Sequence, residues 1–324
     1  MWYAIGWVLV FILLKLKNEY LYQHTWFLYI FGCLLLLGLL LFADPINNSR
    51  CWYTIPGIGS IQPSEFMKIF LMLTLATMIH NFRSDYDNPT MLDEFKFILK
   101  SFGIVLIPSI LTFLQPDTGC VLMYLVIYFS MMFVSGIRMR WFLIGFLIVF
   151  VLGGTFSAIY FFKEDLFIKL FGSSMYYRLE RVINWQDGSG MQLENALAAI
   201  GSAGFFGHGF NHTPIYFPEP QTDFIFAIIS EEFGFVGIII IVSLFFILFY
   251  NVMKLSYSCN DLFAKYLSFG LIMGIMIQMV LNICVVIGLV PVTGVTLPFI
   301  SYGGSSLLIS MASIGIILNI CSKN

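Results

Sequence analysis

The chain has 324 residues, of which 59% are hydrophobic and only 10% are charged, and its net charge is -2. A soluble globular domain carries about 25% charged residues, so this composition excludes an ordinary soluble protein. The near-neutral charge, without a basic run, gives no indication of nucleic-acid binding. Repeated apolar runs of about 20 residues predict an integral membrane protein that crosses the bilayer as helices.

Nine apolar runs are read as membrane-spanning helices of one all-α bundle, a single membrane domain over residues 1–324. The expected spans are 2–14, 25–43, 64–82, 97–114, 119–135, 142–162, 223–250, 264–290 and 300–320. The connection 163–222 is far longer than usual, which favours a functional element. Its small-residue run from Ala196 to Gly209 is expected to form a short helix along the membrane that ends in glycine turns.

The distribution of basic residues predicts the orientation. Ten of the 16 Lys and Arg residues lie in connections on one side of the expected bundle. Because Lys and Arg in short loops remain cytoplasmic, that side and the C-terminus are predicted to be cytoplasmic. The loop 163–222 is then extracytoplasmic, and an odd number of spans places the N-terminus outside.

One polar cluster lies at the start of the third expected span, and a second lies in the turn before the fifth. Glu65 and Lys68 share a helix face, so they can neutralise each other as an ion pair or present Lys68 to an anionic ligand. Ser64 can cap that helix. Asp117, between Pro116 and a glycine, is read mainly as a turn and capping residue.

Three carboxylates occupy one apolar span, which is unusual. Asp223 stands at its start, where it or the preceding threonine can simply cap the helix. Glu231 and Glu232 follow about two turns later. An ionisable group inside a membrane costs about 2.5–3.5 kcal/mol on insertion scales, so a functional site is the default interpretation. We predict Asp223 as a general base that also caps its helix, with the two glutamates as structural or supporting residues.

Two serines are the remaining candidates for substrate binding. Ser301 and Ser305 lie at the start of the last span, where small residues permit close helix packing or offer backbone N–H groups to an anion. No metal site is predicted: the six cysteines are scattered, and the glycines around His208 and His212 argue against a metal-binding helix.

Five motifs in this order resemble the SEDS family of cell-wall proteins, which includes RodA, FtsW and the sporulation homologue. The motifs are Arg50-x-Trp52 before Gln62-Pro63-Ser64-Glu65-x-x-Lys68, Gln115-Pro116-Asp117-x-Gly119, the glycine-rich run 199–209, Pro218-Glu219-x-x-Thr222-Asp223-Phe224 with Glu231-Glu232-x-Gly234, and Pro291-x-Thr293-Gly294 with 297–304. They extend over most of the chain. The Gln62-Pro63-Ser64-Glu65-Phe66-Met67-Lys68 form and the short segment between Gly209 and Pro218 are most like RodA.

The resemblance implies a peptidoglycan glycosyltransferase that polymerises lipid II at the outer face of the bacterial cytoplasmic membrane. It also implies a class B penicillin-binding protein as partner, together with proteins of the elongation or division complex. The family's essential acid falls on Asp223, its outer-loop tryptophan on Trp52, and its Glu/Lys pair on Glu65 and Lys68. The family's usual first span has no counterpart here.

The expected reaction is an inverting sugar transfer with undecaprenyl pyrophosphate as leaving group. Candidate cations for the pyrophosphate are Lys68, Arg50, Arg178 and Arg181, with Mg²⁺ or Mn²⁺ as a further counter-ion. The alternative function is a lipid II flippase or binding scaffold without polymerase activity. It would use the same outer face but require a passage open to both leaflets.

Overall fold

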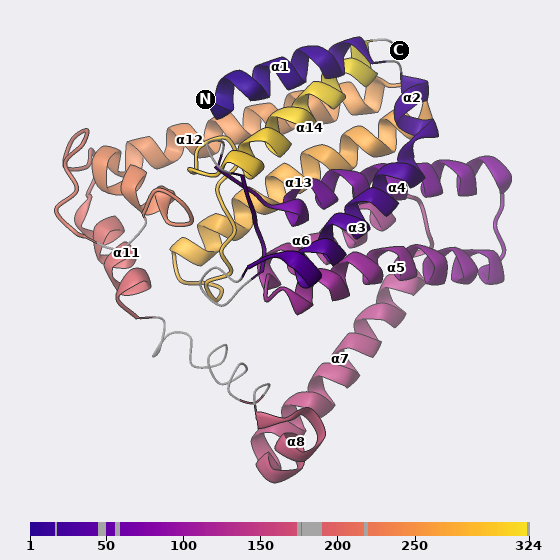
Figure 1. Cartoon of the computed structure of the whole chain (residues 1–324), viewed down its shortest axis with the longest axis horizontal. Helices are drawn as coiled ribbons and strands as arrows, with labels where there is room; N and C mark the ends of the chain where they lie inside the picture. Colours follow the sequence, from indigo (N-terminus) through magenta and orange to yellow (C-terminus); the bar gives the residue numbers. More distant parts are fainter. Residues whose placement is uncertain are drawn as a thin grey trace.

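The computed structural model describes residues 1–16, 18–44, 50–55, 59–173, 176, 190–216 and 220–322. In this part of the chain most of the long helices lie side by side in one bundle, with both termini at the same edge (Figure 1). The strands β1 (Tyr53–Ile55) and β2 (Gly59–Ile61) form an antiparallel pair with Tyr53 opposite Ile61. The predicted all-α membrane bundle is confirmed.

Each of the nine expected spans coincides with a helix, and short helices lie in the connections. The first half contains α1 (Trp2–Lys15), α2 (Asn18–Gln23), α3 (Thr25–Phe42), α4 (Pro63–Asp85), α5 (Met91–Leu114), α6 (Thr118–Val134), α7 (Met139–Phe162) and α8 (Glu164–Phe171). The second half contains α11 (Gly190–Ser202), α12 (Ile225–Ser258), α13 (Leu262–Val286) and α14 (Gly304–Ser322).

Among the described helices, α3, α5, α7, α12 and α13 are long and apolar enough to cross a membrane, while α1, α6 and α14 are apolar but shorter. The helix α4 is long, but it carries Glu65 and Lys68 near its start and Arg83 and Asp85 near its end. The protein is therefore a multi-pass membrane protein. The number of nine spans stays a prediction.

The core of the bundle lies where α13 packs against α4, α6, α12 and α14. Leu71 and Leu75 of α4 and Leu271 of α13 are fully buried there. At one edge α1 runs parallel to α14: the Trp2 ring lies against Gly304 at one end, and the Asn319 amide donates to the Leu16 carbonyl at the other (2.9 Å). This contact joins the two ends of the chain.

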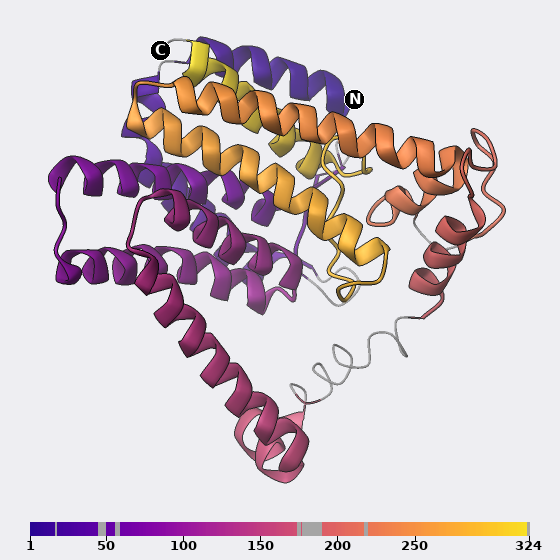
Figure 2. The same cartoon turned by 180° about the vertical axis from the view of Figure 1, so that it is seen from behind.

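The helix α7 leaves the bundle and projects away from it (Figures 1 and 2), and none of its residues is buried. The long connection thus begins with α8 at a distance from the core. The small-residue run begins within α11, which ends at Ser202, and the expected glycine turns follow at Gly204, Gly207 and Gly209 with positive φ.

The helix α12 is broken at Gly234, where φ is 63° and ψ is -159°. The backbone groups freed by the break are paired by the loop after α11. The N–H groups of Phe235 and Val236 donate to the carbonyls of residues 204 and 205, at 3.1 and 3.2 Å. The carbonyls of Glu231 and Glu232 accept from residues 208 and 209, at 2.8 and 3.0 Å. The expected continuous span 223–250 is therefore two helical segments that meet at a kink at Gly234.

Gly234→Ala should destabilise the protein by about 1–3 kcal/mol or more, because a non-glycine residue is strained at this φ and its Cβ would meet the backbone of Phe205 and Gly207. The check is the thermal unfolding midpoint in detergent. Gly103→Ala is the matched control, since no atom lies within 4 Å of its added Cβ and alanine favours a helix. An unchanged midpoint for Gly234→Ala would contradict this account of the break.

Candidate active site

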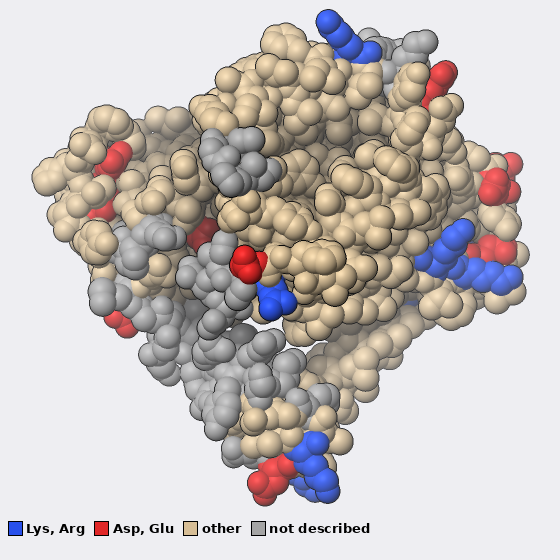
Figure 3. All heavy atoms as spheres, viewed as in Figure 1, with Lys and Arg blue, Asp and Glu red and all other residues tan. Residues whose placement is uncertain are grey.

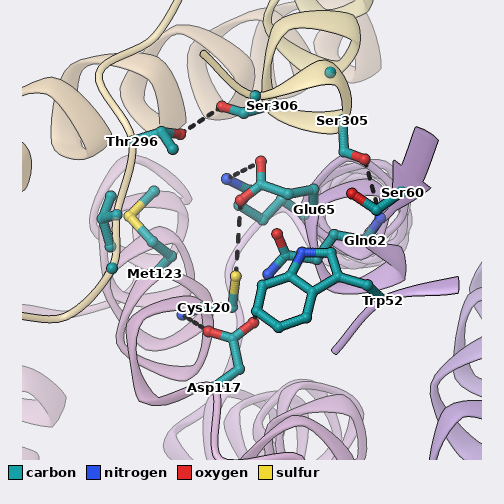
Figure 4. A pocket seen from close by; sticks show the side chains of 15 residues that line it. Trp52, Ser60, Gln62, Glu65, Asp117, Cys120, Met123, Thr296, Ser305 and Ser306 are labelled. Carbon is teal, nitrogen blue, oxygen red and sulfur yellow. Dashed lines mark hydrogen bonds and ion pairs between the residues drawn. The ribbon is translucent and has the colours of Figure 1, made fainter. Parts of the chain in front are cut away.

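A polar cavity of about 90 Å³ lies where the start of α4, the start of α6, the β1–β2 pair and the segment before α14 meet (Figure 4). It gathers five of the residues predicted from the sequence, although they come from distant segments. These are Trp52, Glu65, Lys68, Asp117 and Ser305. Polar clusters that are far apart in the sequence thus meet at one end of the bundle.

Glu65 and Lys68 form the predicted ion pair, with Lys68 Nζ 2.8 Å from Glu65 Oε2. Both side chains are nearly inaccessible, with relative exposures of 10% and 3%. The Cys120 thiol also approaches Glu65, with Sγ 3.7 Å from Oε1. A charge buried this deeply is tolerated only when it is paired and hydrogen-bonded, so the pair belongs to the cavity wall as much as to the helix start.

Gln278 of α13 completes this ion pair and was missed in the sequence analysis. Its Oε1 accepts from Lys68 Nζ at 2.7 Å. Its Nε2 donates to Thr296, at 3.1 Å to the carbonyl and 3.2 Å to Oγ1, and to Ser306 Oγ at 3.1 Å. Lys68 is thereby held between a carboxylate and an amide. The signal was present: Gln278 is a polar residue inside a long apolar run.

Asp117 has the predicted capping role and a second one. Its Oδ1 accepts from the Cys120 N–H at 3.0 Å and caps α6. Its Oδ2 accepts from Gln62 Nε2 and from Ser64 Oγ, both at 2.9 Å. Ser64 was expected to cap α4, which is wrong: Gln62 is the N-cap, and the Ser64 hydroxyl faces Asp117 instead. Asp117 therefore ties the starts of α4 and α6 together.

Trp52 and Ser305 border the cavity from opposite elements. The Trp52 ring lies beside Asp117 and Gln62 (Figure 4). Ser305 at the start of α14 accepts the backbone N–H of Gln62 at 2.9 Å. Since this hydroxyl already accepts one hydrogen bond, it still has a donor to offer to a ligand.

Asp223 lies beside this cavity and does not cap its helix. The N-cap of α12 is Phe224, so the capping part of the prediction is wrong: residues 221–224 form a turn that precedes the helix. The turn is fixed through its backbone, because Asn282 Nδ2 donates to the Asp223 carbonyl and to the Val295 carbonyl, both at 2.7 Å. A Cβ on Gly294, a cavity residue, would stand 3.7 Å from Asp223 Oδ2.

Ser301 fixes the same turn from the other side. Its hydroxyl donates to the Thr222 carbonyl at 2.6 Å and accepts the Leu297 N–H at 2.7 Å. The N–H of Tyr302 donates to the Gln221 carbonyl at 2.8 Å. Ser301 thus holds the loop that presents Asp223 and does not line the cavity. Its predicted contact with substrate stays a prediction.

The predicted arginines lie apart from the cavity or outside the described residues. Arg50 is exposed, and its guanidinium donates to the Leu40 carbonyl at the end of α3 (3.0 Å). Arg178 and Arg181 lie outside the described residues. Among the described residues that line the cavity, Lys68 is the only cation. A role of the three arginines in binding pyrophosphate stays a prediction.

Glu231 and Glu232 bind the loop that fills the break in α12. Glu231, which is fully buried, accepts the Ile215 N–H on Oε1 at 2.9 Å, and Glu232 accepts the Asn211 N–H on Oε1 at 3.1 Å. These contacts support the predicted structural role, which stays a prediction. Nearby, Nε2 of His208 forms a hydrogen bond with the hydroxyl oxygen of Ser202, at 3.1 Å.

The cavity residues do not fit a divalent cation held by protein ligands alone. Glu65 faces Lys68, and both oxygens of Asp117 already accept hydrogen bonds. Within the described residues no group of three or more His, Cys, Asp or Glu side chains could hold a metal ion. Mg²⁺ or Mn²⁺ would need a phosphate group to supply further ligands.

Comparisons with known proteins agree over nearly the whole chain. Residues 1–324 match the FtsW, RodA and SpoVE family, described as cell cycle proteins. Stage V sporulation protein E of Bacillus subtilis is 36% identical over 283 residues, which are 85% of this chain and 72% of the relative. A probable peptidoglycan glycosyltransferase FtsW of Coxiella burnetii is 32% identical over 331 residues, 98% of this chain and 83% of the relative.

Solved structures show the same fold. A chain of a peptidoglycan synthase complex, described as coordinating polymerization and crosslinking, matches with a TM-score of 0.81 and 27% identity, over 99% of this chain and 88% of that chain. The rod shape determining protein RodA of Thermus thermophilus matches with a TM-score of 0.69 and 28% identity, over 99% and 85%.

Lys68→Met should destabilise the protein by about 3–5 kcal/mol, because it leaves the buried Glu65 carboxylate without its cation. Combining it with Glu65→Gln should recover much of that loss, since no unpaired charge then remains. Thermal unfolding in detergent measures both variants, with the exposed Lys254→Met as control. A double variant as unstable as the single one would contradict the importance of charge pairing here.

Proposed function

The chain belongs to the FtsW, RodA and SpoVE family of cell cycle proteins, and we propose that it is a peptidoglycan glycosyltransferase that polymerises lipid II. The sequence resemblance and the comparisons agree on this activity. The observation that carries the assignment of the site is the position of Asp223: it lies beside a cavity with one buried ion pair, on a turn whose backbone carbonyls accept hydrogen bonds from Asn282 and Ser301.

The proposed reaction is a single inverting displacement. The 4-hydroxyl oxygen of the acceptor sugar forms a bond to the anomeric carbon of the donor chain, and the bond from that carbon to the pyrophosphate oxygen breaks. Asp223 accepts the hydroxyl proton as general base, and undecaprenyl pyrophosphate leaves with the bonding electron pair. General base catalysis is typically worth about 10²–10⁴-fold, so positioning must supply much of the remaining acceleration.

The cavity supplies positioning and charge for the substrate. Lys68 is a cation that is already oriented by Glu65 and Gln278, so a ligand phosphate would meet a charge that needs no reorganisation. Trp52 offers an apolar face to a sugar ring, and Ser305 offers a hydroxyl. Arg50, Arg178 and Arg181 are proposed as further cations, and Mg²⁺ or Mn²⁺ as a counter-ion bound together with the pyrophosphate.

The setting of the reaction is also a proposal. We place the chain in the bacterial cytoplasmic membrane with a cytoplasmic C-terminus and the cavity at the outer face, as its Lys and Arg distribution favours. The similarity to a chain of a peptidoglycan synthase complex supports a crosslinking partner, which we propose is a class B penicillin-binding protein. Elongation and division complexes are both compatible with this activity.

The packing beneath the cavity favours polymerisation over transport across the bilayer. Met67 and Leu71 of α4, Ile127 of α6 and Leu271 of α13 have relative exposures of 0–1%. In the described part of the chain, these contacts close the bundle on the side away from the cavity. A flippase would need a passage through this layer.

Asp223→Asn should lower the rate of lipid II polymerisation by at least about 10²-fold, because the amide cannot accept the hydroxyl proton at neutral pH. The fold should be retained, since the turn is fixed through its backbone. Glycan chains formed by purified protein are the readout, with Asp44→Asn, an exposed carboxylate that we also place on the outer side, as control. Wild-type chain formation by Asp223→Asn would overturn the assignment.

Purified wild-type protein in detergent should polymerise lipid II, because the reaction needs no second leaflet. A flippase without polymerase activity would show no product there, yet would move lipid II in vesicles. The crosslinking partner should be added in a second reaction, so that a dependence on it is not mistaken for missing activity. Movement of lipid II in vesicles without glycan chains in either detergent reaction would favour the alternative.

A further inference from the structure

A second cavity, of about 260 Å³, lies at the opposite end of the bundle, between the start of α3, the end of α4 and the start of α5. One water molecule needs about 10–15 Å³, so this cavity has room for a much larger group. Its lining combines aromatic side chains with both signs of charge: Trp26, Met78, Asn81, Phe82, Asp85, Tyr86, Asp93, Lys96, Phe97 and Lys100. The proposed reaction uses none of these residues.

The charged groups of this cavity lie on two helices. Lys96 and Lys100 are one turn apart on α5, so their ammonium groups share a face. Asp85 is the last residue of α4. In the part of the chain that the structure describes, none of these three forms an ion pair within 4.0 Å, whereas Glu65 with Lys68 and Glu94 with Arg138 do. Figure 3 shows basic and acidic side chains next to one another over this end of α4 and α5.

Asp85 carries an electrostatic cost that a cationic ligand would remove. It ends a helix, and the C-terminal end of a helix dipole is negative, so a carboxylate there is unfavourable. Asp93 differs, because its Oδ2 accepts from Thr90 N at 3.0 Å and from Thr90 Oγ1 at 2.6 Å and thereby caps α5. Asp85 is therefore the acidic group most available to a ligand.

The aromatic residues place the cavity at a membrane interface. Phe82 and Phe97 stack with ring centroids 4.3 Å apart and form an apolar wall. Trp26 is 40% exposed, and tryptophan is enriched at the level of lipid headgroups, where its indole N–H meets polar groups. The cavity thus combines an apolar wall with both signs of charge.

We propose that this cavity binds the headgroup of a zwitterionic aminophospholipid, phosphatidylethanolamine, in the leaflet opposite the active site. The lipid phosphate lies between Lys96 and Lys100, and its primary ammonium lies at Asp85. A purely anionic headgroup satisfies the lysines but leaves Asp85 beside additional negative charge. A choline headgroup has no N–H to donate to the carboxylate, so the primary amine distinguishes the preferred lipid.

The test measures which lipids remain bound to the full chain, by native mass spectrometry after exchange into mixtures of phosphatidylethanolamine, phosphatidylglycerol and phosphatidylcholine at equal concentrations. The wild-type chain should retain phosphatidylethanolamine about two- to fivefold over either competitor, the size expected for one partly exposed ion pair. Lys96→Gln with Lys100→Gln should reduce retention of all three lipids.

Asp85→Asn should abolish the preference for phosphatidylethanolamine over phosphatidylglycerol, and the matched control Asp87→Asn, two residues further on and outside the cavity, should preserve it. Thermal unfolding of each variant identifies loss of fold as a separate effect. Equal retention of the lipids by the wild-type chain would overturn the proposal, as would an unchanged preference in Asp85→Asn. Neither result would affect the proposed polymerase activity.

Discussion

The buried pair of Glu65 and Lys68 is the interaction on which the arrangement of the cavity depends. An unpaired charge at the centre of a membrane helix costs about 2.5–3.5 kcal/mol on insertion scales, so the starts of several elements must converge to satisfy both ions. Lys68 donates a hydrogen bond to Gln278 of α13, and Gln278 in turn donates to Thr296 and Ser306. One ion pair thus orders α4, α13 and the segment that leads into α14.

The same segment connects the ion pair to the reacting acid. Thr296 hydrogen-bonds to Gln278, while Val295, its neighbour, accepts from Asn282, which also holds the Asp223 turn. Gln278 and Asn282 are one helical turn apart on α13 and face the same segment. The cation Lys68 and the base Asp223 are therefore positioned by a single stretch of backbone. A substitution of Gln278 or of Asn282 would alter the positions of both groups.

The sequence predicted the features that depend on local pattern. Apolar runs of about 20 residues indicated the helices. The three-residue spacing of Glu65 and Lys68 indicated their ion pair, and Asp117, close to a proline and a glycine, indicated a cap. Features that depend on distant partners were missed. Gln278 acquires its role from a lysine 210 positions earlier, and the turn before α12 is fixed by α13, so the local preference of Asp223 for capping did not prevail. The break at Gly234 is stable only because a separate loop pairs the exposed backbone groups.

Because α12 is broken at Gly234, its first part, from Ile225 to Phe233, is a short helical segment that is held at both ends. One end carries Asp223 and is tied to α13, and the other end is tied to the loop 203–216 by the carbonyls and carboxylates of Glu231 and Glu232. Phe206 and Phe210 of that loop are 79% and 81% exposed. Those rings and the turn that carries the base are therefore connected through the helical stretch from Ile225 to Glu232, which is about 10 Å long at a rise of 1.5 Å per residue.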